Sequence, residues 1–157
     1  MLPVAFDAQI AHNHVQWLVE DIGPRHYRST QEAEAARGVT ARLHEAGWSV
    51  QHIGNNPVAC RGSGRTLFLA HIDSVRGCPG AVDNAGSVAV LLELARTTQA
   101  TDLCLGFPVG EEAGLIGSEQ IAKGWSKVQA TQPSLVVALE FAGHGQPTAV
   151  DLTSIWG

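Results

Sequence analysis

Acidic and histidine side chains stand at the ends of three apolar, strand-like runs of this sequence. The first run ends in His71 and Asp73, the second in Glu111 and Glu112, and the third in Glu140. In open α/β sheets, ligands bind outside the carboxyl ends of the strands, so these side chains are expected to meet at one site. Imidazole and carboxylate groups are donors for divalent metals. The pattern is typical of a metal-dependent hydrolase.

A second interpretation applies to each of these residues alone. A single His or Asp at a strand end is often a cap, a turn former or a satisfied polar residue. The pair Glu111 and Glu112 would repel each other after a buried strand, and a surface turn or a bound cation would relieve that repulsion. Asp83, at the mouth of a helix expected to begin near Asn84, adds a further donor. The combination favours the metal site.

Composition excludes several classes of protein. The 157 residues correspond to one domain, 1–157, with a net charge of -5 and only 10 Lys and Arg in no basic run, so no nucleic-acid partner is expected. Neither a signal peptide nor a run of 18 apolar residues is present, which predicts no membrane association and a cytoplasmic location. Three cysteines without paired spacing are expected to be reduced thiols, with Cys104 in the core.

Helical and strand-like patterns alternate along the chain. Helices are expected over 7–21, 29–47, 85–96 and 118–123, and strands over 48–53, 58–60, 66–71, 102–109 and 135–141. Ser29 and Glu32 form the pattern of a capping box at the start of the second helix. This order predicts an α/β fold.

Several segments resemble one family. HIDSVRGCPGAVDNAGSVAVLLELA, GEEAGLIGS and VVALEF look like the metal-site segments of the zinc-dependent aminopeptidase clan that includes bacterial leucyl aminopeptidase and the glutaminyl cyclases. The stretch LVEDIGPRHYRSTQEAEAARGVTARLHEAGWSV is similar to the N-terminal region of that family. The resemblance implies a three-layer αβα sandwich with a mixed, mostly parallel sheet, here shortened at the C-terminus.

The resemblance also implies a role for each site residue. The metal ligands would be His71, Asp83, Glu112 and Glu140, with Asp83 bridging two ions. Glu111 would be the general base that takes a proton from the water bound to the metal, and Asp73 would orient His71. The cofactor would be one or two zinc ions, with Mn or Co as possible substitutes. A cis peptide between Asp83 and Asn84 is implied as well.

One departure from the family concerns the second metal. The family's fifth ligand is a histidine in a C-terminal segment that has no counterpart in this sequence, so the second site is expected to lack a donor. His144 is a candidate replacement, although a glycine-flanked histidine is more often solvated. An open sheet edge is expected near the apolar end DLTSIWG, which predicts a homo-oligomer or a complementing C-terminal piece.

The predicted function is a metal-dependent exopeptidase that removes N-terminal residues from peptide or aminoacyl substrates. Two alternatives stay open, a single-zinc glutaminyl cyclase and a catalytically weak binding or assembly module. Serine-hydrolase, zincin and P-loop functions are excluded because G-x-S-x-G, H-E-x-x-H and the P-loop Gly-Lys pair are absent.

Overall fold

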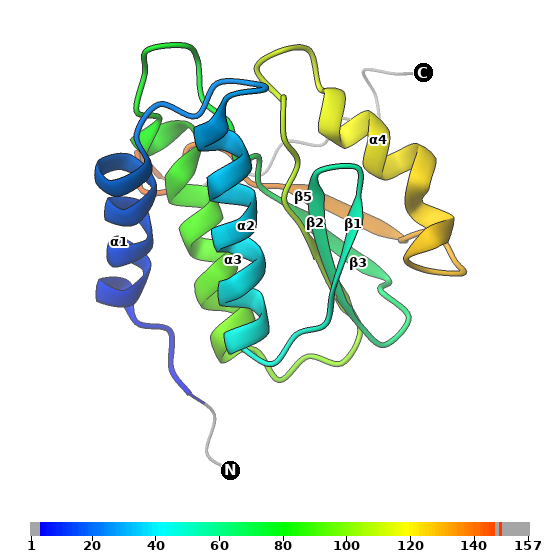
Figure 1. Cartoon of the computed structure of the whole chain (residues 1–157). Helices are drawn as coiled ribbons and strands as arrows, with labels where there is room; N and C mark the ends of the chain where they lie inside the picture. Colours follow the sequence, from blue (N-terminus) through cyan, green and yellow to red (C-terminus); the bar gives the residue numbers. More distant parts are fainter. Residues whose placement is uncertain (1–3, 147, 149–157) are drawn as a thin grey trace.

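The computed structural model describes residues 4–146 and 148, which fold into three layers around one sheet (Figure 1). The strands are β1 (Val50–Ile53), β2 (Asn56–Arg61), β3 (Thr66–Leu69), β4 (Leu103–Gly106) and β5 (Leu135–Ala138). The helices on one face are α1 (Ala8–Gln16) with its continuation η1 (Trp17–Ile22), α2 (Thr30–Glu45) and α3 (Gly86–Thr97). On the other face lie α4 (Ile116–Gly124) and the turn η3 (Trp125–Lys127).

The strand order in the sheet is β1-β2-β4-β3-β5. Strand β3 pairs in parallel with both β4 and β5, whereas β2 is antiparallel to β1 and β4. The predicted αβα class and mixed sheet are therefore confirmed, with two parallel and two antiparallel pairings. Because β3, β4 and β5 run in the same direction, their carboxyl ends meet at one edge, which lies at the top of Figure 1.

Apolar side chains fill both interfaces of the sheet. The larger core packs α1, α2 and α3 on one face and includes Leu18, Val39, Leu43, Ile72, Val88, Leu91, Leu105 and Phe107. The smaller core, under α4, consists of Ile53, Val58, Leu67, Cys104, Ile121 and Trp125. These residues occupy the apolar positions that repeat with the helical and strand periods of the sequence. The predicted helices and strands therefore lie close to their predicted places.

Two local features confirm sequence expectations. Ser29 is the N-cap of α2, and its side chain accepts a hydrogen bond from the Glu32 amide. The peptide between Asp83 and Asn84 is cis, within the short kinked turn η2 (Ala81–Ala85) that leads into α3. The Asn84 side chain donates to the Leu139 carbonyl at 2.9 Å, so η2 is tied to the segment that follows β5.

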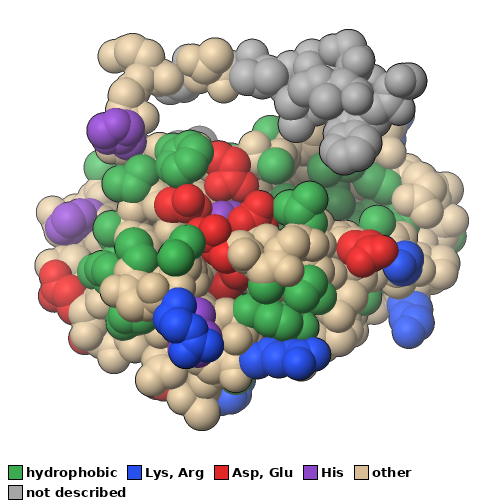
Figure 2. Space-filling model, turned by 90° about the horizontal axis from the view of Figure 1, so that it is seen from above, with side chains coloured by type: hydrophobic (Ala, Val, Ile, Leu, Met, Phe, Trp, Pro, Cys, Tyr) green, Lys and Arg blue, Asp and Glu red, His purple; other side chains and the backbone are tan. Residues whose placement is uncertain are grey.

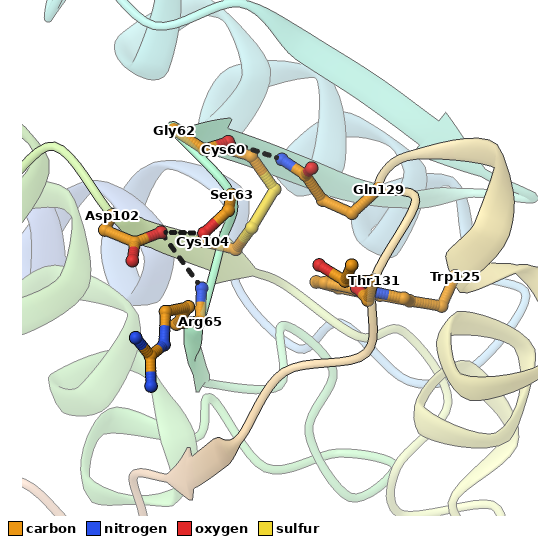
Figure 3. The surroundings of a disulfide bond; sticks show 9 residues. All are labelled: Cys60, Gly62, Ser63, Arg65, Asp102, Cys104, Trp125, Gln129 and Thr131. Carbon is orange, nitrogen blue, oxygen red and sulfur yellow. Dashed lines mark hydrogen bonds between the residues drawn. A yellow bond between two sulfur atoms is a disulfide. The ribbon is translucent and has the colours of Figure 1, made fainter.

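The expectation of three reduced cysteines is wrong for two of them. Cys60 of β2 and Cys104 of β4 face each other across an antiparallel pair and form a disulfide, whereas Cys78 is a free, exposed thiol (Figure 3). Sequence spacing hid this pair because 44 residues separate two cysteines that the sheet brings opposite each other. The cytoplasmic location stays a prediction, and the disulfide does not favour it, because disulfides are rare in cytosolic proteins.

Two other expectations concern the surface. No helix within residues 4–146 is both long enough and apolar enough to cross a membrane. Among the described strands, β5 ends the sheet order on one side, and its Leu135 and Val136 are about half exposed. The apolar end 151–157, on which the open edge was predicted, lies outside the described residues.

Candidate metal centre

His71 lies at the centre of the predicted site, just past the end of β3. The backbone on both sides of it still bonds to the end of β4 and to the chain just beyond it, through Ala70 N to Gly106 O and Ile72 N to Pro108 O. These bonds place the imidazole at the carboxyl edge of the sheet, where its exposed fraction is only 3%. His71 therefore occupies a fixed, buried position under more exposed carboxylates.

Three carboxylates gather around the outer ring nitrogen of His71. The Nε2 atom lies 3.0 Å from Asp83 Oδ1, 3.4 Å from Glu140 Oε2 and 3.9 Å from Glu111 Oε2. Donor atoms within 4.8 Å of one another form two groups among the described residues, His71 with Asp83 and Glu140, and His71 with Glu111 and Glu112. Figure 2 shows acidic side chains clustered around a histidine on the upper face of the molecule.

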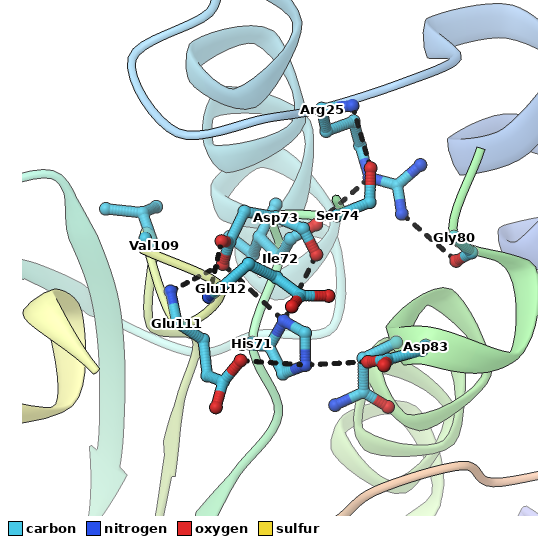
Figure 4. A network of polar contacts seen from close by, with 12 residues as sticks. Arg25, His71, Ile72, Asp73, Ser74, Gly80, Asp83, Val109, Glu111 and Glu112 are labelled. Atoms are coloured by element: carbon cyan, nitrogen blue, oxygen red, sulfur yellow. Dashed lines mark hydrogen bonds and ion pairs between the residues drawn. The ribbon is translucent and has the colours of Figure 1, made fainter. Parts of the chain in front are cut away.

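Asp73 joins the loop that contains His71 to the loop that contains Glu111 and Glu112. Its carboxylate accepts the Glu111 amide at 2.9 Å and the Glu112 amide at 3.1 Å, one on each oxygen (Figure 4). The inner nitrogen of His71, Nδ1, lies 3.1 Å from the Asp73 carbonyl and 3.5 Å from its carboxylate. The two ring nitrogens thus face different groups, the arrangement in which one nitrogen binds a metal while the other is held by an acceptor.

Burial and hydrogen bonds act in opposite directions on the pKa values of His71 and Asp73. Burial alone would lower the His71 pKa, but hydrogen bonds with Asp73 and Glu140 outweigh it and raise the pKa to about 10. Burial alone would raise the Asp73 pKa, yet the His71 ring and the Glu111 amide bring it below its usual value. Without a metal ion, a protonated His71 supplies the positive charge that the acids require.

The pKa values of the two adjacent glutamates are both raised. Burial is the first cause for each; repulsion from Glu140 and Asp73 adds to it at Glu111, and repulsion from Asp83 adds to it at Glu112. One imidazolium cannot balance this many carboxylates. The donor set therefore fits a divalent cation, since a cation would stabilise all of the carboxylates in their charged form.

The structure brings all the predicted site residues together. They are His71, Asp73, Asp83, Glu111, Glu112 and Glu140. Glu111 belongs to one of the donor groups, together with His71 and Glu112. His144 is exposed and belongs to neither group.

Two charged residues next to the site, Arg25 and Glu32, were not predicted from the sequence as part of it. Both are almost fully buried. Glu32 was assigned only to a capping box, but its carboxylate accepts the Gly110 amide instead of the Ser29 amide. Neither residue stands out in the helical or strand pattern of the sequence. The only indication is that each is a charged residue within the stretch GPRHYRSTQE.

A cavity of about 310 Å³ opens beside the acids. Glu112 and Ala113 form one wall, and His26, Tyr27, Ser74, Val75 and Arg76 form the rest. The cavity is mainly apolar in its lining but carries an exposed arginine and a histidine. Among the predicted metal donors, Glu112 lines this cavity.

Residues 53–153 match Peptidase family M28, and this match covers more than half of the chain. The protein therefore belongs to peptidase family M28. The matched region includes every predicted metal donor and begins at the end of β1, so it excludes α1, η1 and α2. No similar sequence was found among curated proteins.

Solved structures share this fold over most of the chain. Glutaminyl cyclase from Porphyromonas gingivalis superposes with a TM-score of 0.74 at 24% identity, covering 87% of this chain and 59% of its own. A leucine aminopeptidase precursor from Bacteroides thetaiotaomicron gives 0.73 at 20% identity, with 89% and 64% covered. An inferred Zn-dependent exopeptidase from Bacteroides vulgatus gives 0.70 at 24% identity, with 89% and 62% covered. The chain thus spans less than two thirds of each.

Proposed function

We propose that this chain carries the metal centre of an exopeptidase that removes N-terminal residues from peptides. The observation that supports this most directly is the convergence of three segments on the outer nitrogen of His71, which carry Asp83, Glu111 and Glu140. His71, Asp83 and Glu140 would hold the first metal ion, and Asp83 and Glu112 a second one. Zinc fits this mixture of imidazole and carboxylate donors, and Mn or Co would also be accepted.

Each residue then has a defined part in hydrolysis. When bound, the metal polarises the scissile carbonyl and lowers the pKa of a coordinated water. Glu111 accepts a proton from the attacking water, and its raised pKa suits a base that later returns the proton to the leaving amine. Asp73 holds His71 and the Glu111 amide in place. The cavity beside Glu112 would receive a residue of the substrate.

The test uses two substitutions at the site and one away from it. Glu111→Gln is expected to keep the metal and lose about 10² to 10⁴ in kcat on an aminoacyl anilide, because a positioned base contributes that much to rate. Asp83→Ala is expected to lose the metal. Glu119→Gln, on the exposed side of α4, is the control and should change neither. Full turnover by Glu111→Gln would show that another group is the base.

A single-metal glutaminyl cyclase is the second candidate. One observation favours it, namely that Asp83 and Glu112 do not appear together in a donor group, whereas His71, Asp83 and Glu140 do. Metal content per chain and the product formed from an N-terminal glutaminyl peptide separate the two functions. A cyclase releases ammonia and leaves the peptide bond intact, whereas an exopeptidase releases a free amino acid.

A further inference from the structure

The segment 23–32, which runs from the end of η1 into the first turn of α2, contacts both the loop 72–80 and the turn at Gly110. Arg25 in this segment is fully buried, which is rare for arginine, and its guanidinium bonds to backbone carbonyls. The acceptors are Ile72 O at 3.0 Å from Nε, Leu18 O, Gly23 O and Pro79 O at 2.9, 3.0 and 2.7 Å from Nη1, and Gly80 O at 3.2 Å from Nη2.

Three of these carbonyls belong to the loop 72–80, which joins His71 to η2 and hence to Asp83. Arg25 binds this loop at both ends, at Ile72 and at Pro79 and Gly80 (Figure 4). Its backbone is also paired with Ser74, whose hydroxyl accepts the Arg25 amide at 3.0 Å. The guanidinium therefore sets the distance between the segment after β3 and the turn that presents Asp83.

Close packing explains why Gly80 is required there. Its φ is +59°, and a Cβ at this position would lie 2.6 Å from the Ser74 Cβ and 3.0 Å from Arg25 Nη2. Burial lowers the Arg25 pKa to about 10, and Asp73 opposes this shift, so the guanidinium keeps its charge at neutral pH. Its five donors thus remain available to the loop.

Glu32 makes the corresponding contact to the second loop. Its exposed fraction is 4%, and its two oxygens accept the Gly110 amide at 3.0 Å and the Arg28 amide at 2.8 Å. The Tyr27 ring covers the same glycine, where a Cβ would lie 2.5 Å from the ring. Gly110 directly precedes Glu111, so this contact fixes the start of the turn that carries both glutamates.

We propose that Arg25 and Glu32 are positioning residues that hold the loop 72–80 and the turn at Gly110 at a fixed separation, so that one divalent ion meets both Asp83, which follows the loop, and Glu112, which follows Gly110. This inference rests on the proposed function for the identity of the ligand. Both residues lie outside the region 53–153 that matches the family, so the site described by that region is completed by a segment that precedes it.

The substitutions Arg25→Lys and Glu32→Gln test the proposal. Lysine keeps the charge but replaces the five donors of the planar guanidinium with one ammonium that has three. Glutamine keeps the size but has one acceptor oxygen for two amide donors. Each variant is expected to bind Zn²⁺ and Co²⁺ 10 to 100-fold more weakly in competition with a chromophoric chelator, the usual effect of losing an outer-shell partner. The visible absorption of bound Co²⁺ should change as well.

Two control variants have matched chemistry elsewhere in the molecule. Arg61 also donates to backbone carbonyls, at Thr98 and Ala46, and Glu93 is a buried glutamate that accepts the Asp7 amide. Arg61→Lys and Glu93→Gln should therefore lose thermal stability but keep the affinity for Zn²⁺ and the Co²⁺ spectrum. A purely structural role for Arg25 and Glu32 would make them behave like these controls, and that result would overturn the proposal.

Amide hydrogen exchange of the metal-free protein separates this inference from the proposed function. Arg25→Lys should speed exchange at Ser74, whose amide bonds to Arg25 O, and Glu32→Gln should speed exchange at Gly110 and Glu111. If the wild-type chain binds neither Zn²⁺ nor Co²⁺, the proposed function is wrong. The positioning role of Arg25 and Glu32 is then tested by amide hydrogen exchange alone. If Arg25→Lys and Glu32→Gln exchange at these amides as slowly as the wild type does, and the control variants are also unchanged, the positioning role is contradicted.

Discussion

Asp73 is the residue on which the candidate site depends most. Each of its oxygens accepts one amide from the Glu111 and Glu112 turn, and the same carboxylate lies 3.5 Å from His71 Nδ1. Hydrogen bonds from neutral donors to a charged acceptor are stronger than those between neutral groups. The buried Asp73 carboxylate thus links the segment that carries His71 to the turn that carries Glu111 and Glu112. It lies on the Nδ1 side of the imidazole, whereas Asp83 and Glu140 lie on the Nε2 side.

Replacing Asp73 with Asn is expected to weaken metal binding more than it weakens the fold. Asparagine has one acceptor oxygen, so one of the two glutamate amides loses its partner, and His71 loses a nearby negative charge. We expect a loss of roughly 10 to 100-fold in Zn²⁺ affinity, measured by chelator competition.

The matched control is Asp102→Asn. Asp102 accepts the Ser63 hydroxyl and the Arg65 amide at the opposite end of the sheet, so it makes the same kind of contact far from the site. Its substitution should leave the affinity unchanged. An Asp73→Asn protein that binds Zn²⁺ as tightly as the wild type would show that His71 and the glutamates are held by other contacts.

At the scale of elements, α1 is joined to α3 through one buried carboxylate. Glu93 of α3 has no exposed area, accepts the Asp7 amide at the start of α1 at 2.6 Å, and pairs with Arg96. Burial alone would raise the Glu93 pKa, but the Arg96 and Asp7 hydrogen bonds outweigh it and lower the pKa. The charged form of Glu93 therefore stabilises the folded state.

Glu93→Gln is expected to lower the free energy of unfolding by roughly 1.5 to 3 kcal/mol at pH 7, the range for hydrogen bonds to charged groups. Because the folded pKa lies below the unfolded one, this contribution is present above the unfolded pKa and disappears as the pH falls through the folded pKa. The difference between the variant and the wild type in urea unfolding should therefore shrink on acidification.

Glu119→Gln serves as the comparison for that experiment. Glu119 pairs with Lys123 on the exposed surface of α4, where an ion pair contributes about 0 to 1 kcal/mol. A Glu93→Gln effect as small as that of Glu119→Gln, or one that is constant from pH 7 to acid, would rule out the proposed role of the charged Glu93.

The sequence predicted these elements because their signals are local. The helical periods, the Ser29 cap and the apolar strands depend on neighbours a few residues apart, and the structure has each of them near its predicted place. The Cys60 and Cys104 disulfide, the Arg25 contacts to the loop 72–80 and the bond from Glu32 to Gly110 depend on pairings 44 or more residues apart. Such pairings exist only once the sheet and its loops are assembled, so no period reveals them.

At the scale of the whole molecule, the disulfide and the glutamate pair of the acidic cluster lie toward opposite ends of β4. Cys104 stands next to Leu103, the first residue of β4, whereas Glu111 follows the end of that strand. The disulfide packs in the smaller core with Trp125. The two features should therefore be separable, one for stability and one for chemistry.

The double variant Cys60→Ala, Cys104→Ala tests this separation. Its free energy of unfolding is expected to fall by about 2 to 4 kcal/mol, the usual contribution of a disulfide. The affinity for Zn²⁺ at a temperature where both proteins are folded should be unchanged. A tenfold weaker affinity in the folded double variant would show instead that the bond shapes the metal site.

The disulfide also closes a covalent ring from residue 60 to residue 104. Three of the site residues, His71, Asp73 and Asp83, lie inside that ring, and its most exposed stretch is 75–79, which includes Arg76. A protease that cuts once after Arg76 would break the chain without releasing either piece. The nicked protein would migrate as one intact chain in denaturing electrophoresis, and two fragments would separate only after reduction of the sample.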